Sequence, residues 1–214
     1  MLAWARRGRG IGPVRAPTWA VIALVLLVGV PLSGPWTSPV QGASNPIVTE
    51  NQQPGSGQWQ IPNASGTALA DDTNNQIKGY ASAASLNKGS SITFYVTVNP
   101  AQTFTMDIFR VGYYQGLGGR LMQHVNALQG VRQPACPIVD ASTRLVVCSW
   151  SPSYTLTVPT TWTDGLYLVV LTNAKGYQND IVLTVRDDAR TAALLFQQSV
   201  NTYQAYNDWG GYSL

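Results

Sequence analysis

ITFYVTVNPAQTFTMDIFRV, residues 92–111, contains two runs in which apolar and polar side chains alternate. Alternation with a period of two is typical of a β-strand that buries one face and exposes the other. Asn99-Pro100 lies between the two runs and is typical of a turn. The stretch therefore predicts two consecutive half-buried strands.

Similar runs continue outward from this pair as far as residue 186. They are short, they are separated by turns rich in glycine, proline and aspartate, and none has the period of a helix. Seven or eight short strands over about 120 residues are typical of an antiparallel β-sandwich, of the immunoglobulin-like or carbohydrate-module-like kind. The further strands that we expect lie at residues 120–125, 144–150, 154–158, 165–173 and 180–186.

We place the sandwich at residues 67–187, after a polar, extended entry segment at residues 44–66. GLYLVVLTN, residues 165–173, is apolar at almost every position, which predicts a strand in the centre of a sheet. RVGYYQGLGG, residues 110–119, has the glycine content of a phosphate-binding loop. It lacks the Lys-Ser/Thr of such a loop and lies between two expected strands, so a hairpin connection is the better interpretation.

The segment 1–43 has the pattern of a targeting sequence. Four arginines occur within the first fifteen residues, and an uncharged apolar run from Trp19 to Val30 follows them. A run of about 12 residues fits the hydrophobic region of a signal peptide, whereas a membrane-spanning helix needs about 20. The segment is either a cleaved signal, with Val40 and Gly42 before the cleavage point, or an uncleaved N-terminal membrane anchor. Both interpretations predict export, so we expect a secreted or otherwise extracytoplasmic protein.

The formal net charge of +3 arises from this leader. When its four arginines are set aside, nine of the thirteen basic residues remain against ten acidic ones. No basic stripe is left to contact phosphates, so we exclude nucleic acid as a partner. Contact with a membrane is expected only through the N-terminal segment.

Cys136 and Cys148 are the only cysteines. In an exported domain the default for two cysteines is a disulfide, and closing so short a loop stabilises by roughly 3 kcal/mol in the chain-entropy model. The alternative of a metal-binding pair lacks partners, because His124 is the only histidine. A zinc site of histidine and cysteine ligands is therefore excluded.

Two carboxylate pairs, Asp71-Asp72 and Asp187-Asp188, have a composition that suits calcium. Adjacent residues point to opposite sides of an extended chain, so solvated loop carboxylates are the better interpretation. No Ser–His–Asp or Cys–His set can be assembled from the sequence, and we assign no catalytic residue to this chain.

The pattern changes after Arg186. AALLF, residues 192–196, is an apolar run without alternation, which suits a buried parallel strand at the start of an α/β sheet. The polar, aromatic stretch that follows is then in the position of a loop at the carboxyl end of that strand, where the sites of α/β sheets lie.

Three motifs in this order resemble proteins related to the large (beta) subunit of N,N-dimethylformamidase. They are DIFRVGYYQGLGGRLM at 107–122, GLYLVVLTN followed by VRDD at 185–188, and TYQAYNDWGGYSL at 202–214. The resemblance implies that an all-β domain precedes an α/β domain that carries the chemistry. We therefore expect residues 188–214 to be the truncated start of that second domain, and the chain to be the N-terminal fragment of an exported dimethylformamidase-like protein. The sandwich would be an accessory or binding domain to the missing catalytic domain.

The resemblance also implies a mononuclear iron held by tyrosine and glutamate oxygens, with Tyr206 at the position of one ligand in a full-length chain. A phenolate is a hard anionic donor that suits ferric iron, and bound iron lowers the pKa of water for amide hydrolysis. We expect the fragment itself to hold no cofactor and to be inactive, whereas a full-length relative would be an amide hydrolase.

The alternative is a free-standing module on the cell surface that binds carbohydrate or another surface polymer, or that mediates adhesion, without catalysis. Exposed aromatic rings are typical contacts in such modules. The candidates are Trp59, Tyr113, Tyr114 and Trp162.

Overall fold

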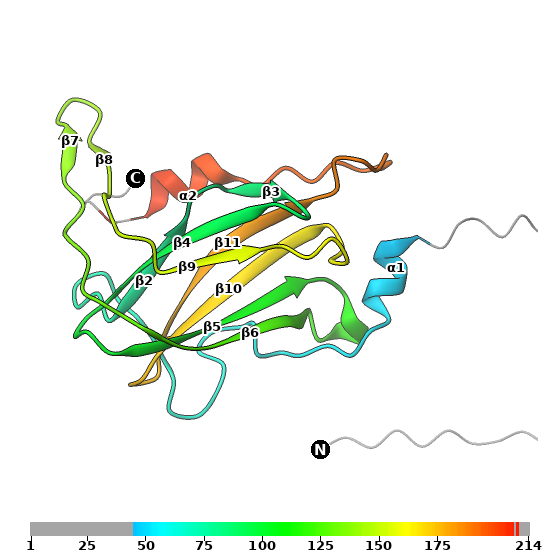
Figure 1. The fold of residues 1–214 in the computed structure, drawn as a ribbon, viewed down its shortest axis with the longest axis horizontal. Coiled ribbons are helices and arrows are strands. Elements are labelled where there is room, and N and C mark those ends of the chain that lie inside the picture. Colours follow the sequence, from blue (N-terminus) through cyan, green and yellow to red (C-terminus); the bar gives the residue numbers. More distant parts are fainter. Residues whose placement is uncertain (1–44, 208, 210–214) are drawn as a thin grey trace, which may run out of the picture. The chain divides into compact units, whose positions relative to one another are not determined.

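The computed structural model describes residues 45–207 and residue 209, which form two β-sheets, a separate two-stranded hairpin and two short helices (Figure 1). The predicted leader, residues 1–43, lies outside the described residues. Within the part that is described, no helix is long and apolar enough to cross a membrane.

The larger sheet is built around β10 (Gly165–Asn173), the strand that the sequence places at its centre. β10 pairs antiparallel with β11 (Tyr177–Arg186) on one side and with β5 (Thr103–Val111) on the other, and β6 (Gly119–Gln129) pairs antiparallel with β5. Two short strands, β1 (Ala68–Leu69) and β3 (Ser85–Asn87), join β11 in parallel. The sheet therefore departs from a wholly antiparallel arrangement only in these two short strands.

The smaller sheet consists of β2 (Ile77–Ala81), β4 (Ser91–Val98) and β9 (Tyr154–Thr157), all antiparallel. Its inner face packs on that of the larger sheet, because the alternating apolar residues of both sheets belong to one buried cluster. The predicted β-sandwich is thus confirmed. Its innermost side chains include Ile92, Phe94, Val96, Val98, Phe104, Met106, Ile108, Val169, Leu171 and Leu183.

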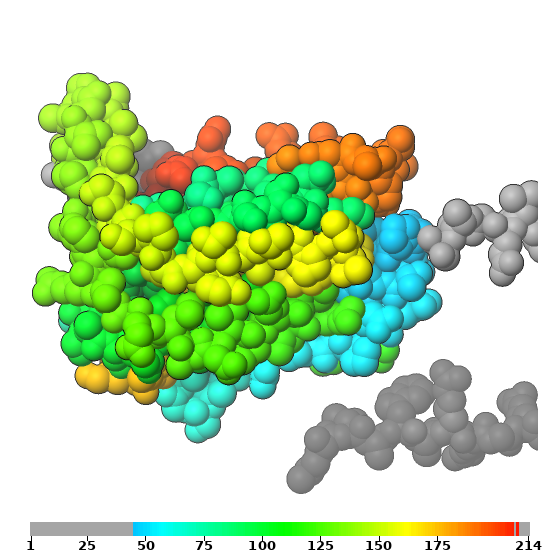
Figure 2. Space-filling model, viewed as in Figure 1, coloured from blue at the N-terminus to red at the C-terminus, as the bar shows by residue number. Residues whose placement is uncertain are grey.

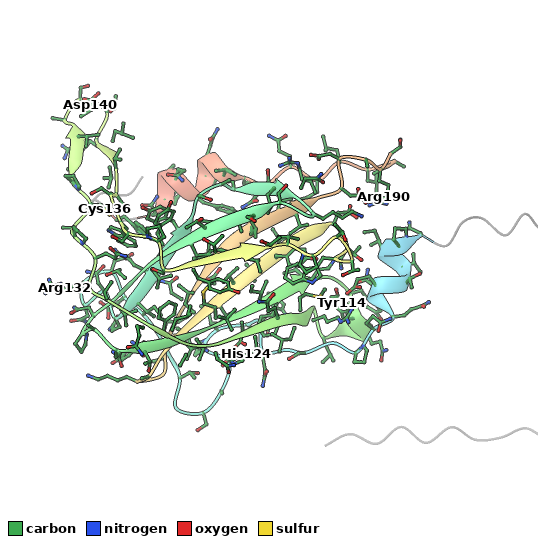
Figure 3. All side chains as sticks on the ribbon, in the orientation of Figure 1. Tyr114, His124, Arg132, Cys136, Asp140 and Arg190 are labelled. Atoms are coloured by element: carbon green, nitrogen blue, oxygen red, sulfur yellow. A yellow bond between two sulfur atoms is a disulfide. The ribbon has the colours of Figure 1, made fainter. Side chains whose placement is uncertain are left out.

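The connection between β6 and β9 runs along β4 at both of its ends, and its middle part projects from the sandwich as a hairpin (Figures 1 and 2). Its strands are β7 (Ile138–Asp140) and β8 (Leu145–Val146), which are shorter than the strand expected at residues 144–150. The predicted disulfide is present: Cys136 and Cys148 are bonded, with their Cα atoms 4.4 Å apart. Cys136 lies at the base of the hairpin and Asp140 at its tip (Figure 3).

The entry segment is not simply extended, as the sequence suggested, because it begins with helix α1 (Pro46–Asn51). The Asn45 side chain caps this helix by accepting a hydrogen bond of 3.0 Å from the Ile47 N–H. Pro46 occupies the start of the helix, where its missing N–H costs nothing. The chain then reaches the larger sheet, where the Asn63 N–H donates to Gln178 Oε1 over 3.0 Å.

Helix α1 is joined to the β5–β6 connection by a buried polar network. Glu50 Oε1 accepts hydrogen bonds from the Tyr114 hydroxyl (2.9 Å) and from the Arg120 guanidinium (2.7 Å). Arg110 donates to the Tyr114 hydroxyl over 3.0 Å and to the Asp164 carbonyl oxygen over 2.9 Å. Both arginines that flank the predicted hairpin are therefore held by hydrogen bonds. Arg120 is held by Glu50, the only glutamate of the chain.

The β5–β6 connection contains the 3-10 helix η1 (Tyr114–Gly116), in agreement with the predicted hairpin connection. Tyr114 and Gln115 adopt left-handed backbone conformations, with φ of 40° and 59°. This costs energy for residues with a side chain, and the Tyr114 hydrogen bonds offset it. Gly118 also has a positive φ of 81°, and a Cβ added there would lie 2.7 Å from the Trp59 ring.

We expect the disulfide to order the hairpin without holding the sandwich together, because two-stranded hairpins are marginally stable in water. Replacing Cys136 and Cys148 by serine should speed amide hydrogen exchange at residues 137–147 at least tenfold and leave exchange in β4 and β10 within about twofold. Hydrogen exchange with mass spectrometry measures both regions in one sample. An equal increase of the amide exchange rate in the hairpin and in the core would contradict the expectation that the disulfide orders only the hairpin.

Burial raises the pKa of the Tyr114 hydroxyl from its ordinary value of 10.0 to about 12. Below pH 10 the hydroxyl is protonated in both folded and unfolded chains. Between pH 10 and 12 Tyr114 ionises first in the unfolded chain, so its own contribution should lower folding stability by about 1–3 kcal/mol over this window, in addition to that of buried Tyr167, whose pKa is also raised. In denaturant titrations, Tyr114→Phe should make the fall smaller by this amount and lower stability at pH 7 by about 1–3 kcal/mol. The control Tyr113→Phe, at an exposed neighbour, should change neither quantity.

Candidate functional site

The described part of the C-terminal segment, residues 187–207 together with Trp209, returns to the sandwich at several points. Asp187 forms an ion pair with Lys88. Arg190 donates to the Asp164 carboxylate over 2.6 Å (Arg190 is labelled in Figure 3). Further along, Gln198 Oε1 accepts a hydrogen bond of 2.6 Å from the Thr184 hydroxyl. The start of the segment is thus attached to strands and turns of the larger sheet.

The end of the segment inserts Trp209 among aromatic rings on the outer face of the smaller sheet. The Trp209 ring stacks on Trp150, with centroids 5.4 Å apart, and meets the edge of Tyr80 at 6.0 Å. Tyr80 in turn stacks on Tyr95 at 4.9 Å. We call Tyr80, Tyr95 and Trp150 the aromatic face. Offset and edge contacts of this kind contribute about 0.5–1.5 kcal/mol each beyond the buried area.

Lys78 completes the contact with Trp209. Its ammonium lies 4.7 Å from the centroid of a Trp209 ring and 2.9 Å from Asp72 Oδ1. Because Lys78 is buried, the charge is partly desolvated, which strengthens the attraction of the ring for the cation. Burial also raises the pKa of the Tyr80 hydroxyl, which donates to the Cys148 carbonyl oxygen at 3.4 Å. The aromatic face is thereby linked to the base of the disulfide hairpin.

The hairpin beside this face carries exposed aliphatic side chains. They are Ile138, Val139, Leu145 and Val147. At its tip, the Asp140 carboxylate accepts hydrogen bonds from the backbone and hydroxyl of Ser142, which lower the pKa of Asp140. The hairpin therefore presents apolar sides and a polar tip.

Two expectations for the C-terminal segment are wrong. Residues 192–196 form no strand: Leu194 and Leu195 are 89% and 94% exposed, and Phe196 is 59% exposed. A strand needs at least one neighbouring strand to pair with, and among the described residues no strand pairs with this run. The stretch expected to be a loop instead forms helix α2 (Val200–Tyr206).

Tyr206 is the one residue of this chain that the resemblance places at an iron-ligand position, and only in a full-length protein. Tyr206 ends α2 with 64% of its surface exposed, and Glu50, the only glutamate, is engaged by Tyr114 and Arg120. No group of three or more histidine, cysteine or acidic side chains at 45–207 or 209 could hold a metal ion. The role of Tyr206 in a full-length chain stays a prediction.

The four aromatic residues expected to contact a ligand have different environments. Tyr114 is fully buried, and Trp162 is buried and stacks on Tyr167 at 5.2 Å, so neither ring faces solvent and both expectations are wrong. Trp59 is half-buried and donates from Nε1 to the Leu117 carbonyl oxygen over 2.9 Å. Tyr113 alone of the four is well exposed, at 69%.

The carboxylate pairs are used within the fold. Asp71 accepts hydrogen bonds from Asn74 and Gln76, while Asp72 pairs with Lys78. In the second pair, Asp187 contacts Lys88 and Asp188 contacts Arg186, an arrangement that serves the segment's attachment.

His124 lies on β6 at the surface (Figure 3). Its Nδ1 is 2.6 Å from Asp107 Oδ1 on the neighbouring strand β5.

Sequence reasoning missed the aromatic face and Lys78. Tyr80, Trp150 and Trp209 are all far from one another in the sequence, so no local pattern indicates that their rings meet. The alternation in IKGYA, residues 77–81, was the available signal, because it places Lys78 and Tyr80 together on the outer side of β2.

We expect Trp209 to hold the end of the C-terminal segment on the aromatic face. Trp209→Ala should speed hydrogen exchange at residues 198–207 at least tenfold and shift the fluorescence of the remaining tryptophans, since the stacked partner of Trp150 is lost. Tyr203→Ala, a half-exposed aromatic residue of the same segment, is the matched control and should do neither. Identical exchange in both variants would show that Trp209 does not anchor the segment.

Solved structures give only weak similarity. An uncharacterized protein from Bacillus anthracis str. Ames is 9% identical, with 47% of this chain and 75% of that chain covered and a TM-score of 0.28. The alkylpurine DNA glycosylase AlkC of Pseudomonas fluorescens is 14% identical over 52% of this chain and 30% of its own, with a TM-score of 0.27. A beta-glucosidase from Listeria innocua is 13% identical over 51% and 16%, with a TM-score of 0.26.

Similarity at the level of sequence families is specific. A search of curated proteins found no match. The sequence model described as N,N-dimethylformamidase beta subunit-like, C-terminal, matches residues 105–214, slightly more than half of the chain. The matched range runs from β5 through the disulfide hairpin, β10 and β11 to the segment that carries Trp209. The chain therefore belongs to the N,N-dimethylformamidase beta subunit-like family.

Proposed function

We propose that this chain is the N-terminal part of an exported N,N-dimethylformamidase-like protein, in which the β-sandwich is an accessory domain that positions a following α/β domain. The matched family region supports this proposal because it joins half of the sandwich to the C-terminal segment. The disulfide is compatible with an oxidising, extracytoplasmic location.

One observation carries the proposal: the C-terminal segment is attached near both ends and is apolar and exposed in its middle. The ion pairs of Asp187 and Arg190 hold its start, and Trp209 holds its end. Between them, Leu194 and Leu195 are almost fully exposed. Removing a leucine side chain from water is worth about 1.5–3 kcal/mol, so this run is suited to a partner sheet that covers it.

The sandwich would hold the segment that leads into such a domain in a fixed position. A segment tied at two places loses less conformational entropy when the following domain docks than a free linker would. The aliphatic side chains of the hairpin lie beside the aromatic face on which Trp209 is held, and they offer an apolar surface to that domain.

Any amide hydrolysis would then belong to the following domain. No group of three or more histidine, cysteine or acidic side chains among the described residues could hold a metal ion, and Tyr206 is the last residue of the short helix α2. In the longer protein, Tyr206 would contribute to an iron site only together with ligands from that domain.

Matched substitutions in two lengths of the protein test the proposal. Leu195→Asn should change the free energy of unfolding of the 214-residue chain by less than about 0.5 kcal/mol, because the side chain is already in water. In the longer polypeptide purified from the native host, the same change should cost about 2–4 kcal/mol, because it would place a polar amide in a buried sheet.

Leu183→Asn in the core is the control and should destabilise both lengths strongly. A native polypeptide that ends at Leu214, or an equally small effect of Leu195→Asn in a longer one, would contradict the proposal. Recovery of the native polypeptide only from the cytoplasm would contradict its export.

A further inference from the structure

Three connections of the sandwich line an open, polar cavity of about 380 Å³. They are the loop before β2, the β4–β5 turn and the β10–β11 turn, and they lie at the end of the sandwich opposite to α1 and η1 (Figure 1). Loops gathered at one end of a β-sandwich are a common place for binding sites, because the sheets hold them rigidly. The lining residues are Asn74, Gln76, Asn99, Pro100, Asn173, Lys175 and Tyr177.

The walls of this loop-end cavity are fixed by hydrogen bonds. Asn173 is buried, and its side chain donates to the Gln76 carbonyl oxygen (3.1 Å) and accepts from the backbone N–H groups of Lys175 and Tyr177 (3.0 Å each). Asn99 donates from Nδ2 to the Asn74 carbonyl oxygen over 2.8 Å. A ligand would therefore meet a preformed surface and would not have to order these loops.

Asp71 fixes the side-chain amides of Asn74 and Gln76. Its carboxylate accepts hydrogen bonds from the side chains of Asn74 (3.0 Å) and Gln76 (2.7 Å). These bonds lower the pKa of Asp71 to about 2, so the carboxylate keeps its charge across the physiological pH range. The amide groups are held in one orientation by this anchor.

Unused hydrogen-bonding capacity remains on the ligand side. The Lys175 ammonium and the Tyr177 hydroxyl bond to no described residue, and neither do the side-chain oxygens of Asn74 and Asn99. The cavity thus offers both donors and acceptors, together with the apolar surfaces of Pro100 and the Tyr177 ring. An apolar ligand would leave these polar groups unpaired, at a cost of about 1–3 kcal/mol each.

Hydroxyl-rich molecules match this lining. Each hydroxyl both donates and accepts, and amide side chains offer both functions in a fixed plane. The C–H faces of a sugar ring can in addition pack on a tyrosine ring or a proline. Lys175 supplies the only charged group of the lining, so a polyanion would find one cation and no cluster.

We propose that the loop-end cavity binds a hydroxyl-rich saccharide, with Lys175, Tyr177 and Asn99 as contact residues. The proposal does not depend on a following domain, because all of its residues lie within the sandwich. It places the contact at the opposite end from Tyr113, the one candidate aromatic residue that remains well exposed.

The test uses the 214-residue chain and neutral oligosaccharides: cellohexaose, xylohexaose, mannohexaose and chitohexaose. Isothermal titration calorimetry gives the affinity, and the NMR signals of the asparagine side-chain amides locate the site. At least one oligosaccharide should bind and should shift the side-chain signals of Asn74 and Asn99.

Two double variants identify the surface. Lys175→Ala with Tyr177→Phe removes only the groups that bond to no described residue and should weaken binding at least tenfold, with an unchanged melting temperature. Tyr113→Phe with Asn126→Ala removes an exposed hydroxyl and an exposed amide elsewhere on the sandwich and should leave the affinity within twofold. Binding that survives the first variant, binding lost in the second variant only, or no binding by any of the four oligosaccharides would overturn the proposal.

Discussion

The meeting of two alternating strands is the constraint on which the structure depends. Phe94 and Val96 of β4 face Met106 and Ile108 of β5 and its neighbours across the sandwich, and all four are excluded from solvent. A slip of one residue in either strand would turn the whole apolar set outward, so burial fixes the register as well as the fold. Everything else in the domain is attached to the ends or outer faces of these sheets.

That arrangement separates three surfaces with different chemistry. One end carries the network of Glu50, Tyr114 and the arginines, which joins α1 to the β5–β6 connection. The other end carries the polar loop-end cavity. The outer face of the smaller sheet carries the aromatic face and receives Trp209. The proposed docking surface and the proposed saccharide site therefore share no residues.

The family match does not coincide with a structural boundary. It begins at residue 105, within β5, and so leaves β2 and β4 outside. Those two strands form most of the smaller sheet, and β4 supplies four core side chains. The matched half cannot close a hydrophobic core without them, since a single sheet must bury its apolar face against another layer. The preceding strands are thus part of the same folding unit as the family region.

The sequence by itself determined the strands, because alternation is a local consequence of backbone geometry. Residues 92–98, 103–111 and 165–173 could be identified in this way, and so could the disulfide, because the domain contains two cysteines and its leader predicts export. Tertiary structure alone decided which of the neighbouring tyrosines, Tyr113 or Tyr114, is buried. Tyr114 turns inward and Tyr113 outward because a left-handed turn, Arg110 and Glu50 meet there. It also decided the contact of Trp209 with Tyr80, since partners so distant in sequence are chosen only when the sheets have packed.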